Sequence, residues 1–167
     1  TTFMQTIRES GRHLLELINS ILDLANIQAS DLRLDRQCGD LQELVSDVVE
    51  RHRIEADEKE LYLNLMIQPP VPRKFNTHAP RFQQLLDILI DNAVKFTEEG
   101  GVIIAVTAAR NPSDSALKIA VTDTGVGIDQ EAQGRLFRPF SRGDESMTVT
   151  HGGTGLGLVL AQYIAEA

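Results

Sequence analysis

Three short segments of the chain contain residue types that could together bind a nucleotide. In chain order they are residues 91–97, 123–128 and 152–158. The first offers an amide and an amine, the second a carboxylate followed by glycines, and the third several closely spaced glycines. These groups suit a helix that binds metal and phosphate, a carboxylate that accepts from adenine, and a second phosphate-binding helix start. The sequence therefore predicts an ATP site that lacks a Walker loop.

Asn92 and Lys95 are the metal and phosphate candidates of the first segment. They are three residues apart in a stretch of helical periodicity, so they share one face of the helix. The neutral amide oxygen of Asn92 suits a Mg²⁺ ion that is held mostly by phosphates and water. Lys95 can meet a phosphate as a point charge. The alternative is an ordinary solvated helix face.

Asp123 is the base-recognition candidate of the second segment. It follows a predicted strand over 117–122, and Gly125 and Gly127 let the backbone turn tightly and approach a ligand before Ile128. A carboxylate can accept a hydrogen bond from the exocyclic amine of adenine, whereas guanine presents a carbonyl at that position. The alternative is an aspartate that only stabilises a β-turn.

The third segment is rich in glycine where a helix is predicted to begin. Free backbone N–H groups at a helix start, together with the helix dipole, favour anions. The spacing matches neither G-x-G-x-x-G nor a Walker loop. A glycine-rich helix entry without a ligand is the alternative. The phosphate-binding candidates are Gly153, Thr154, Gly155, Leu156 and Gly157.

A fourth segment, residues 136–142, lies between the two glycine-bearing segments. Phe137 and Phe140 flank Pro139 and could anchor a flexible loop by apolar contact. Arg138 or Arg142 could then approach a γ-phosphate. The alternative is a hydrophobic latch with solvated arginines.

Composition excludes several function classes. The chain has 167 residues, is 42% hydrophobic and has a net charge of −8, with no basic stripe. This argues against nucleic acid as a partner, because phosphate backbones require clustered cations. Cys38 is the single cysteine, so neither an intrachain disulfide nor a thiolate metal cluster can form. No apolar run approaches the roughly 20 residues of a membrane span.

Residues 2–29 have the periodicity of a helix with an unusually wide apolar surface. Ile7, Leu14 and Ile21 recur every seven residues, and further apolar rows flank them. Such a helix needs neighbours on two sides, as in a bundle or a dimer. The alternative is a helix packed only on its own domain.

The remaining periodicity predicts an α+β sandwich, with one sheet and its helices on one face. Helices are expected at 41–58 (capped by Asp40), 80–96 (Pro80 in its first turn), 129–136 and from about 155. Strands are expected at 31–35, 61–67, 101–109 and 116–122. A rigid proline-rich connection at 69–72, a turn at 111–114 and a polar loop at 141–151 join them.

The ordered motifs resemble the catalytic and ATP-binding half of sensor histidine kinases, in the superfamily shared with gyrase, heat-shock chaperone and mismatch-repair ATPases. The resemblance covers the N box at 92–97, the G1 box at 123–128, the F box at 137–140 and the G2 box at 153–158. Residues 3–29 resemble the second helix of the dimerisation and phosphotransfer bundle, ending in Leu-Asp-Leu-x-x-Ile.

The resemblance implies a fold, a domain division and partners. The fold would be the Bergerat α/β sandwich over 30–167, preceded by a bundle helix at 1–29, with ATP and Mg²⁺ under a lid at about 129–152. The closing strands after the last helix would be missing. Pairing through 3–29 would give a homodimer or a hetero-pair. A response regulator or receiver domain would receive the phosphoryl group, and the domain would be cytoplasmic in a parent that could be anchored in the inner membrane.

The resemblance also assigns roles to individual residues. Asn92 would bind the metal, and Lys95 and Arg142 would neutralise phosphate charge during transfer. Asp123 would recognise adenine. The other residues expected to line the nucleotide are Gly125, Gly127, Ile128, Phe140 and the G2 residues 153–157. The γ-phosphoryl would pass to a histidine outside this chain.

Two departures from the family pattern bear on function. Ile88 stands four residues before Asn92, where the ATPase relatives have a glutamate base and kinases often have asparagine. An isoleucine cannot activate water, which argues against hydrolysis as the main function. His13, His52, His78 and His151 match no phosphoacceptor box, so structural or solvated roles are expected, with His151 nearest the phosphate-binding glycines. The alternative hypothesis is a degenerate kinase that acts as a nucleotide-binding or inhibitory dimerisation module.

Overall fold

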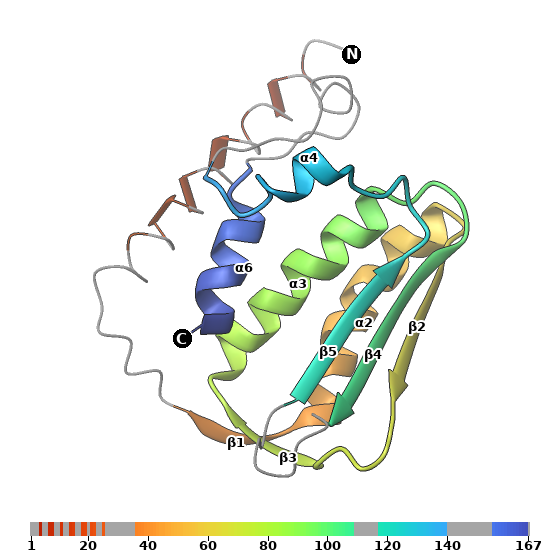
Figure 1. Ribbon diagram of the computed structural model, residues 1–167, viewed down its shortest axis with the longest axis vertical. Coiled ribbons are helices and arrows are strands. Elements are labelled where there is room, and N and C mark those ends of the chain that lie inside the picture. The colour runs from red at the N-terminus through yellow and green to blue at the C-terminus, as the bar shows by residue number, and fades with distance from the viewer. Residues whose placement is uncertain are drawn as a thin grey trace. The chain divides into compact units, whose positions relative to one another are not determined.

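The computed structural model in Figure 1 describes most of the chain beyond the first 35 residues. The described residues are 4, 7, 8, 11, 14, 15, 18, 19, 21, 22, 25, 36–108, 117–139 and 155–166. Within these residues, no helix combines the length and the apolar character that crossing a membrane requires. The predicted strand at 31–35, the turn at 111–114 and the loop at 141–151 lie outside the described residues.

The chain forms two compact units. One is Leu34–Gly127, and the other combines Thr1–Arg33 with Ile128–Ala167. The domain boundary expected between residues 29 and 30 stays a prediction.

The unit Leu34–Gly127 contains a mixed three-stranded sheet and two long helices. The strands are β2 (Tyr62–Ile67), β4 (Gly101–Ala108) and β5 (Leu117–Asp123), in the order β2-β4-β5. β4 runs parallel to β2 and antiparallel to β5. The helices α2 (Leu41–Glu58) and α3 (Ala79–Lys95) cover the same face of this sheet (Figure 1). The predicted α+β class with helices on one face is confirmed.

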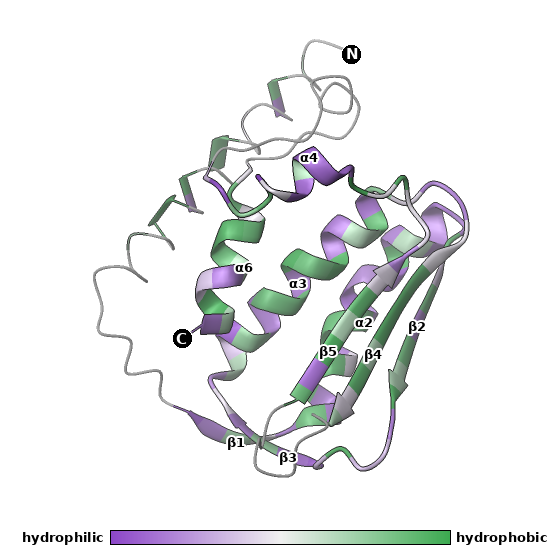
Figure 2. Cartoon of the chain, viewed as in Figure 1, coloured by the Kyte–Doolittle hydropathy of each residue, from purple (hydrophilic) through white to green (hydrophobic). Residues whose placement is uncertain are grey.

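Strand alternation explains why one face of this sheet is buried. Val102, Ile104 and Val106 of β4 are fully buried, and the register aligns Val106 with Ile67 of β2 and Ile119 of β5. These side chains form one core with the apolar faces of α2 and α3. Figure 2 shows the apolar positions along β4 and the alternation of apolar and polar positions on α3. The core therefore fixes α3, and with it Asn92 and Lys95, against the sheet.

A second, two-stranded sheet departs from the prediction of one sheet. β1 (Gln37–Asp40) pairs antiparallel with β3 (Lys74–Thr77). β3 was missed because Pro69, Pro70 and Pro72 favour an irregular connection, and the four-residue strand follows them directly.

Both long helices begin at side-chain caps. Oδ1 of Asp40 accepts from the backbone amides of Gln42 and Glu43 at the start of α2, as predicted. α3 begins one residue before the predicted start, because His78 caps it: its Nδ1 accepts from the Arg81 amide at 3.3 Å. Pro80 lies in the first turn of α3, as predicted.

The other unit contains α4 (Gln130–Gln133), capped by Asp129, and α6 (Gly157–Glu166). α4 is shorter than the predicted helix at 129–136, because the chain continues in turns from Gly134. The described residues between 4 and 25 are helical, as predicted. The large apolar side chains among them are exposed: Met4, Ile7, Leu14, Leu15, Ile18, Ile21 and Leu22.

Candidate nucleotide-binding site

Asn92 lies half-buried near the end of α3, where its side chain is oriented by the helix itself. Its Nδ2 donates a hydrogen bond of 2.8 Å to the carbonyl oxygen of Ile88. This bond uses the amide nitrogen and leaves the amide oxygen as an acceptor. A neutral oxygen in a fixed position fits the ligand chemistry of Mg²⁺, so the residue present suits the expected metal.

Lys95 supplies positive charge at the last position of α3, three residues after Asn92. Its Nζ lies 5.6 Å from the centroid of the Phe96 ring, within the range of a cation–π contact. A second lysine was missed by the sequence analysis. Lys59 Nζ donates to the carbonyl oxygens of Val94 and Lys95, at 2.8 and 3.0 Å, and so caps the end of α3. No motif marks Lys59, since its partners are backbone atoms.

Asp123 is the last residue of β5, and its carboxylate is held by a local turn. In the sheet register it pairs with Val102, a core residue, so its side chain belongs to the helix-covered face. Oδ1 accepts a hydrogen bond of 2.9 Å from the Gly125 amide. The second carboxylate oxygen is not used by this turn, and the residue is exposed. Asp123 can therefore accept from a ligand amine.

The loop after Asp123 lies directly against the end of α3. A Cβ atom added to Gly125 would collide with the carbonyl oxygen of Phe96 and would lie 2.9 Å from Oδ1 of Asp123. Gly127 has a φ of 71°, which side chains rarely adopt. The first predicted segment and residues 123–127 of the second are thus brought together within one unit, the first at the end of a helix and the second at the end of a strand.

Thr124 fastens this loop and was not assigned a role by the sequence analysis. Its hydroxyl donates to the carbonyl oxygen of Glu99 at 2.7 Å and accepts from the Gly101 amide at 2.9 Å. The loop after α3 and the loop after β5 are thereby tied together. The signal for Thr124 in the sequence was its position inside the segment 123–128.

The remaining predicted site residues belong to the other unit or lie outside the described residues. Gly155 has a φ of 67°, Leu156 is buried, and Gly157 begins α6. Ile128 and Arg138 are exposed. Phe140, Arg142, Gly153, Thr154 and His151 lie outside the described residues. Their predicted roles stay predictions.

The end of α3 and the loop after β5 can orient a nucleotide but contain no base for water at the expected position. Ile88, one turn before Asn92, is half-buried and apolar. The arrangement offers an amide oxygen, a cation and a carboxylate acceptor. It is suited to binding and charge neutralisation.

More than half of the chain matches a known protein family. Residues 77–167 match the family HATPase_c, described as histidine kinase-, DNA gyrase B- and HSP90-like ATPase. The matched region includes α3 and both glycine-bearing segments.

Named relatives are sensor kinases. The signal transduction histidine-protein kinase BarA of Escherichia coli (strain K12) is 36% identical over 164 residues, which are 98% of this chain and 18% of BarA. The sensor protein GacS of Pseudomonas syringae pv. syringae is 34% identical over 165 residues, with the same two coverages. The chain thus spans less than a fifth of the length of these relatives.

Solved structures share the fold. Full-length ShkA in complex with AMPPNP aligns with a TM-score of 0.83 at 30% identity, over 99% of this chain and 33% of ShkA. The Acinetobacter baumannii histidine kinase AdeS aligns with a TM-score of 0.75 at 22% identity, over 98% of this chain and 72% of AdeS. The Bergerat fold expected from the motifs is confirmed by these alignments.

Proposed function

The chain belongs to the family of histidine kinase-, DNA gyrase B- and HSP90-like ATPases, and we propose that it is the ATP-binding kinase core of a two-component sensor histidine kinase. The full protein transfers the γ-phosphoryl group of ATP to a histidine outside this chain, and a response-regulator or receiver-domain aspartate receives it next. The likeness to BarA, GacS and ShkA supports this proposal.

The observation that supports ATP as the ligand is the pairing of the α3 end with Asp123. Asn92 and Lys95 lie on that helix, and the loop of Asp123 contacts its last residues through Gly125 and Phe96. In the proposal the amide oxygen of Asn92 ligates Mg²⁺, Lys95 neutralises phosphate charge, and Asp123 accepts from the adenine amine. Mg²⁺ would add charge neutralisation at the β- and γ-phosphates.

The residues of the second unit enter the proposal through the motif match. Backbone amides of residues 153–157 would contact the phosphates, Ile128 and Phe140 would line the base, and Arg142 would neutralise charge at the γ-phosphate. Catalysis is then positioning and electrostatic stabilisation of an in-line transfer. The bond from the γ-phosphorus to the β–γ bridging oxygen breaks, a bond to a histidine nitrogen forms, and ADP leaves.

The proposal includes pairing of chains through residues 3–29. The helical residues described there expose seven large apolar side chains. Such a surface fits a helix that is buried in a bundle, as a homodimer or with another kinase.

Calorimetric titration with ATP and GTP tests the nucleotide assignment. Asp123→Asn replaces a charged acceptor by an amide that can present a donor, and we expect ATP affinity to fall by about 10- to 100-fold. Asp47→Asn, an exposed acid of α2, is the matched control and should bind ATP normally. Unchanged ATP affinity in Asp123→Asn would remove Asp123 from the site.

Phosphorylation assays test the kinase assignment separately. The isolated chain with ATP should form no phosphohistidine, whereas the full-length protein should. ATP binding by a full-length protein that never becomes phosphorylated would favour a degenerate, inhibitory module. Steady hydrolysis by the isolated chain would instead indicate an ATPase despite Ile88.

A further inference from the structure

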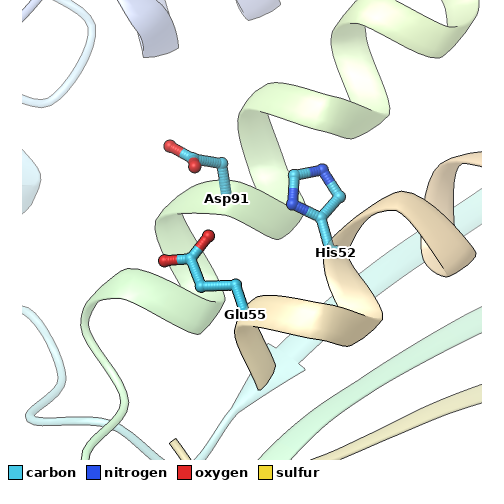
Figure 3. Close-up of side chains that lie close together, drawn as sticks. All are labelled: His52, Glu55 and Asp91. Carbon is cyan, nitrogen blue, oxygen red and sulfur yellow. The ribbon is translucent and has the colours of Figure 1, made fainter. Parts of the chain in front are cut away.

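Three potential metal ligands converge between α2 and α3, and none of them is among the groups assigned to the nucleotide. They are His52 and Glu55 of α2 and Asp91 of α3. One ligand atom from each lies within 4.8 Å of the other two. Figure 3 shows the Nδ1 edge of the His52 ring turned toward the two carboxylates. From this geometry we infer a binding site for a divalent transition-metal ion that bridges the two helices.

The other ring nitrogen of His52 is already bound to a carboxylate. Nε2 of His52 lies 3.0 Å from Oδ1 of Asp87, and Oδ2 of Asp87 accepts from Arg51 at 2.8 Å. A carboxylate oxygen accepts, so the contact with Asp87 places the ring proton on Nε2. Nδ1 is then the unprotonated nitrogen that faces Glu55 and Asp91. A histidine oriented in this way by an outer carboxylate is the usual arrangement at metal sites in proteins.

Burial and mobility of the side chains suit closure around an ion. The His52 side chain is only 13% exposed and therefore has a fixed position, whereas Glu55 and Asp91 are exposed. Ligand atoms about 2.0–2.1 Å from a tetrahedral zinc ion lie ~3.3 Å apart. Since the three atoms lie within 4.8 Å of one another, the carboxylates must approach by at most about 1.5 Å. Rotation of two exposed carboxylates achieves this without moving either helix.

The donor set favours particular ions. Zn²⁺ accepts both imidazole nitrogen and carboxylate oxygen ligands, and water can complete the tetrahedron. Mg²⁺ prefers oxygen ligands alone, so the nitrogen of His52 disfavours it. The site is therefore distinct in chemistry from the proposed Mg²⁺ ligand Asn92, although Asp91 precedes Asn92 in the chain. A bound ion would link α2 to the helix that supports nucleotide binding.

Titration of the whole chain with Zn²⁺ in the absence of nucleotide tests the site. We expect one ion per chain by calorimetry and a rise in the melting temperature with Zn²⁺. Glu55→Gln and Asp91→Asn should each weaken binding at least tenfold, and both lie at exposed positions that tolerate the change. Asp57→Asn is the control: it removes the same charge from α2 but lies two residues, about 200°, around the helix from Glu55.

Two further measurements separate this site from other ligands in the chain. Nitrogen-15 spectra of the His52 ring should show zinc on Nδ1 and a proton on Nε2. Asn92→Ala should leave the Zn²⁺ affinity unchanged. Zn²⁺ binding that survives Glu55→Gln and Asp91→Asn, or that is lost in Asn92→Ala alone, would overturn the proposal, as would the absence of any Zn²⁺ binding. None of these results depends on whether the chain binds ATP.

Discussion

The side-chain amide of Asn92 donates a 2.8 Å hydrogen bond to the carbonyl oxygen of Ile88, one helical turn earlier. This bond fixes which end of the amide can meet a metal. Because the nitrogen faces the helix, the oxygen is the end presented for ligation. The identity of residue 88 does not matter for this orientation, since only its backbone takes part.

Replacing Asn92 by alanine should remove the Mg²⁺-dependent part of ATP affinity. Loss of a residue that only supports a metal ligand lowers metal affinity by about tenfold or more. Loss of the ligand itself should therefore lower the affinity by at least about tenfold. Calorimetric titrations with and without Mg²⁺ would measure this: affinity falls with Mg²⁺ present and changes little without it. Asn64→Ala, at an exposed position of β2, is the control. An equal loss under both conditions would show that Asn92 contacts the nucleotide itself.

The sequence sufficed to predict the long elements, whereas the identity of the ligand groups stays a prediction. α2 has the predicted bounds because its apolar period and its Asp40 cap agree. At α2 the local pattern and the tertiary structure favour the same outcome. Asn92, Lys95 and Asp123 are predicted from the chemistry of their side chains, and their roles stay predictions.

The features that the sequence analysis missed depend on contacts between distant segments. β1 and β3 are four residues each and exist through their mutual pairing. Lys59 donates hydrogen bonds to carbonyl oxygens 35 and 36 residues away, and no sequence pattern predicts such contacts with the backbone. No sequence pattern marks His52 as a ligand, because Asp87 and Asp91 approach it from another helix.

Lys59→Met should destabilise the unit Leu34–Gly127 through the end of α3. The substitution removes an ammonium that binds two helix-terminal carbonyls and opposes the helix dipole. Because Lys59 is only half-buried, we expect a loss of about 1–2 kcal/mol in the free energy of unfolding, measured by urea denaturation. Lys118→Met, an exposed lysine of β5, should change it little. A loss as small as that of the control would mean that water replaces the ammonium without cost.

Asp40 should titrate at unusually low pH. Its hydrogen bond with Arg73, 2.8 Å from Arg73 Nε to Oδ2, and the amides of α2 hold its pKa below the ordinary 3.8. A depressed folded-state pKa contributes stability that is present above the unfolded-state pKa and is lost as pH falls through the folded-state value.

Arg73→Gln should therefore raise the pKa of Asp40 toward its ordinary value, as followed by carboxyl carbon NMR between neutral and strongly acid pH. The stability difference from the native chain should shrink as the acid range is entered. Lys118→Gln removes a charge elsewhere and should leave the titration of Asp40 unmoved. If Arg73→Gln did the same, the backbone amides alone would account for the low pKa of Asp40.

Three glycine-to-alanine substitutions should differ in how much stability they cost, according to the free space and the backbone conformation at each glycine. At Gly125 the new methyl group collides with the Phe96 carbonyl oxygen, so the loop must move away from α3. We expect a stability loss of about 1–3 kcal/mol and weaker ATP binding. At Gly127 the methyl has open space but φ is 71°, and the cost should be about 1–2 kcal/mol.

Gly134 completes the series as a control, because its φ of −67° suits alanine and the nearest atom is 3.6 Å away, an ordinary contact. Gly134→Ala should be neutral or stabilising by up to about 1 kcal/mol. Urea denaturation and ATP titration of all three variants give the ranking. Normal ATP affinity in Gly125→Ala, together with lost stability, would separate the contact between Gly125 and Phe96 from nucleotide binding. In that case Asp123 would be positioned by its turn and by Thr124 rather than by the close approach to α3.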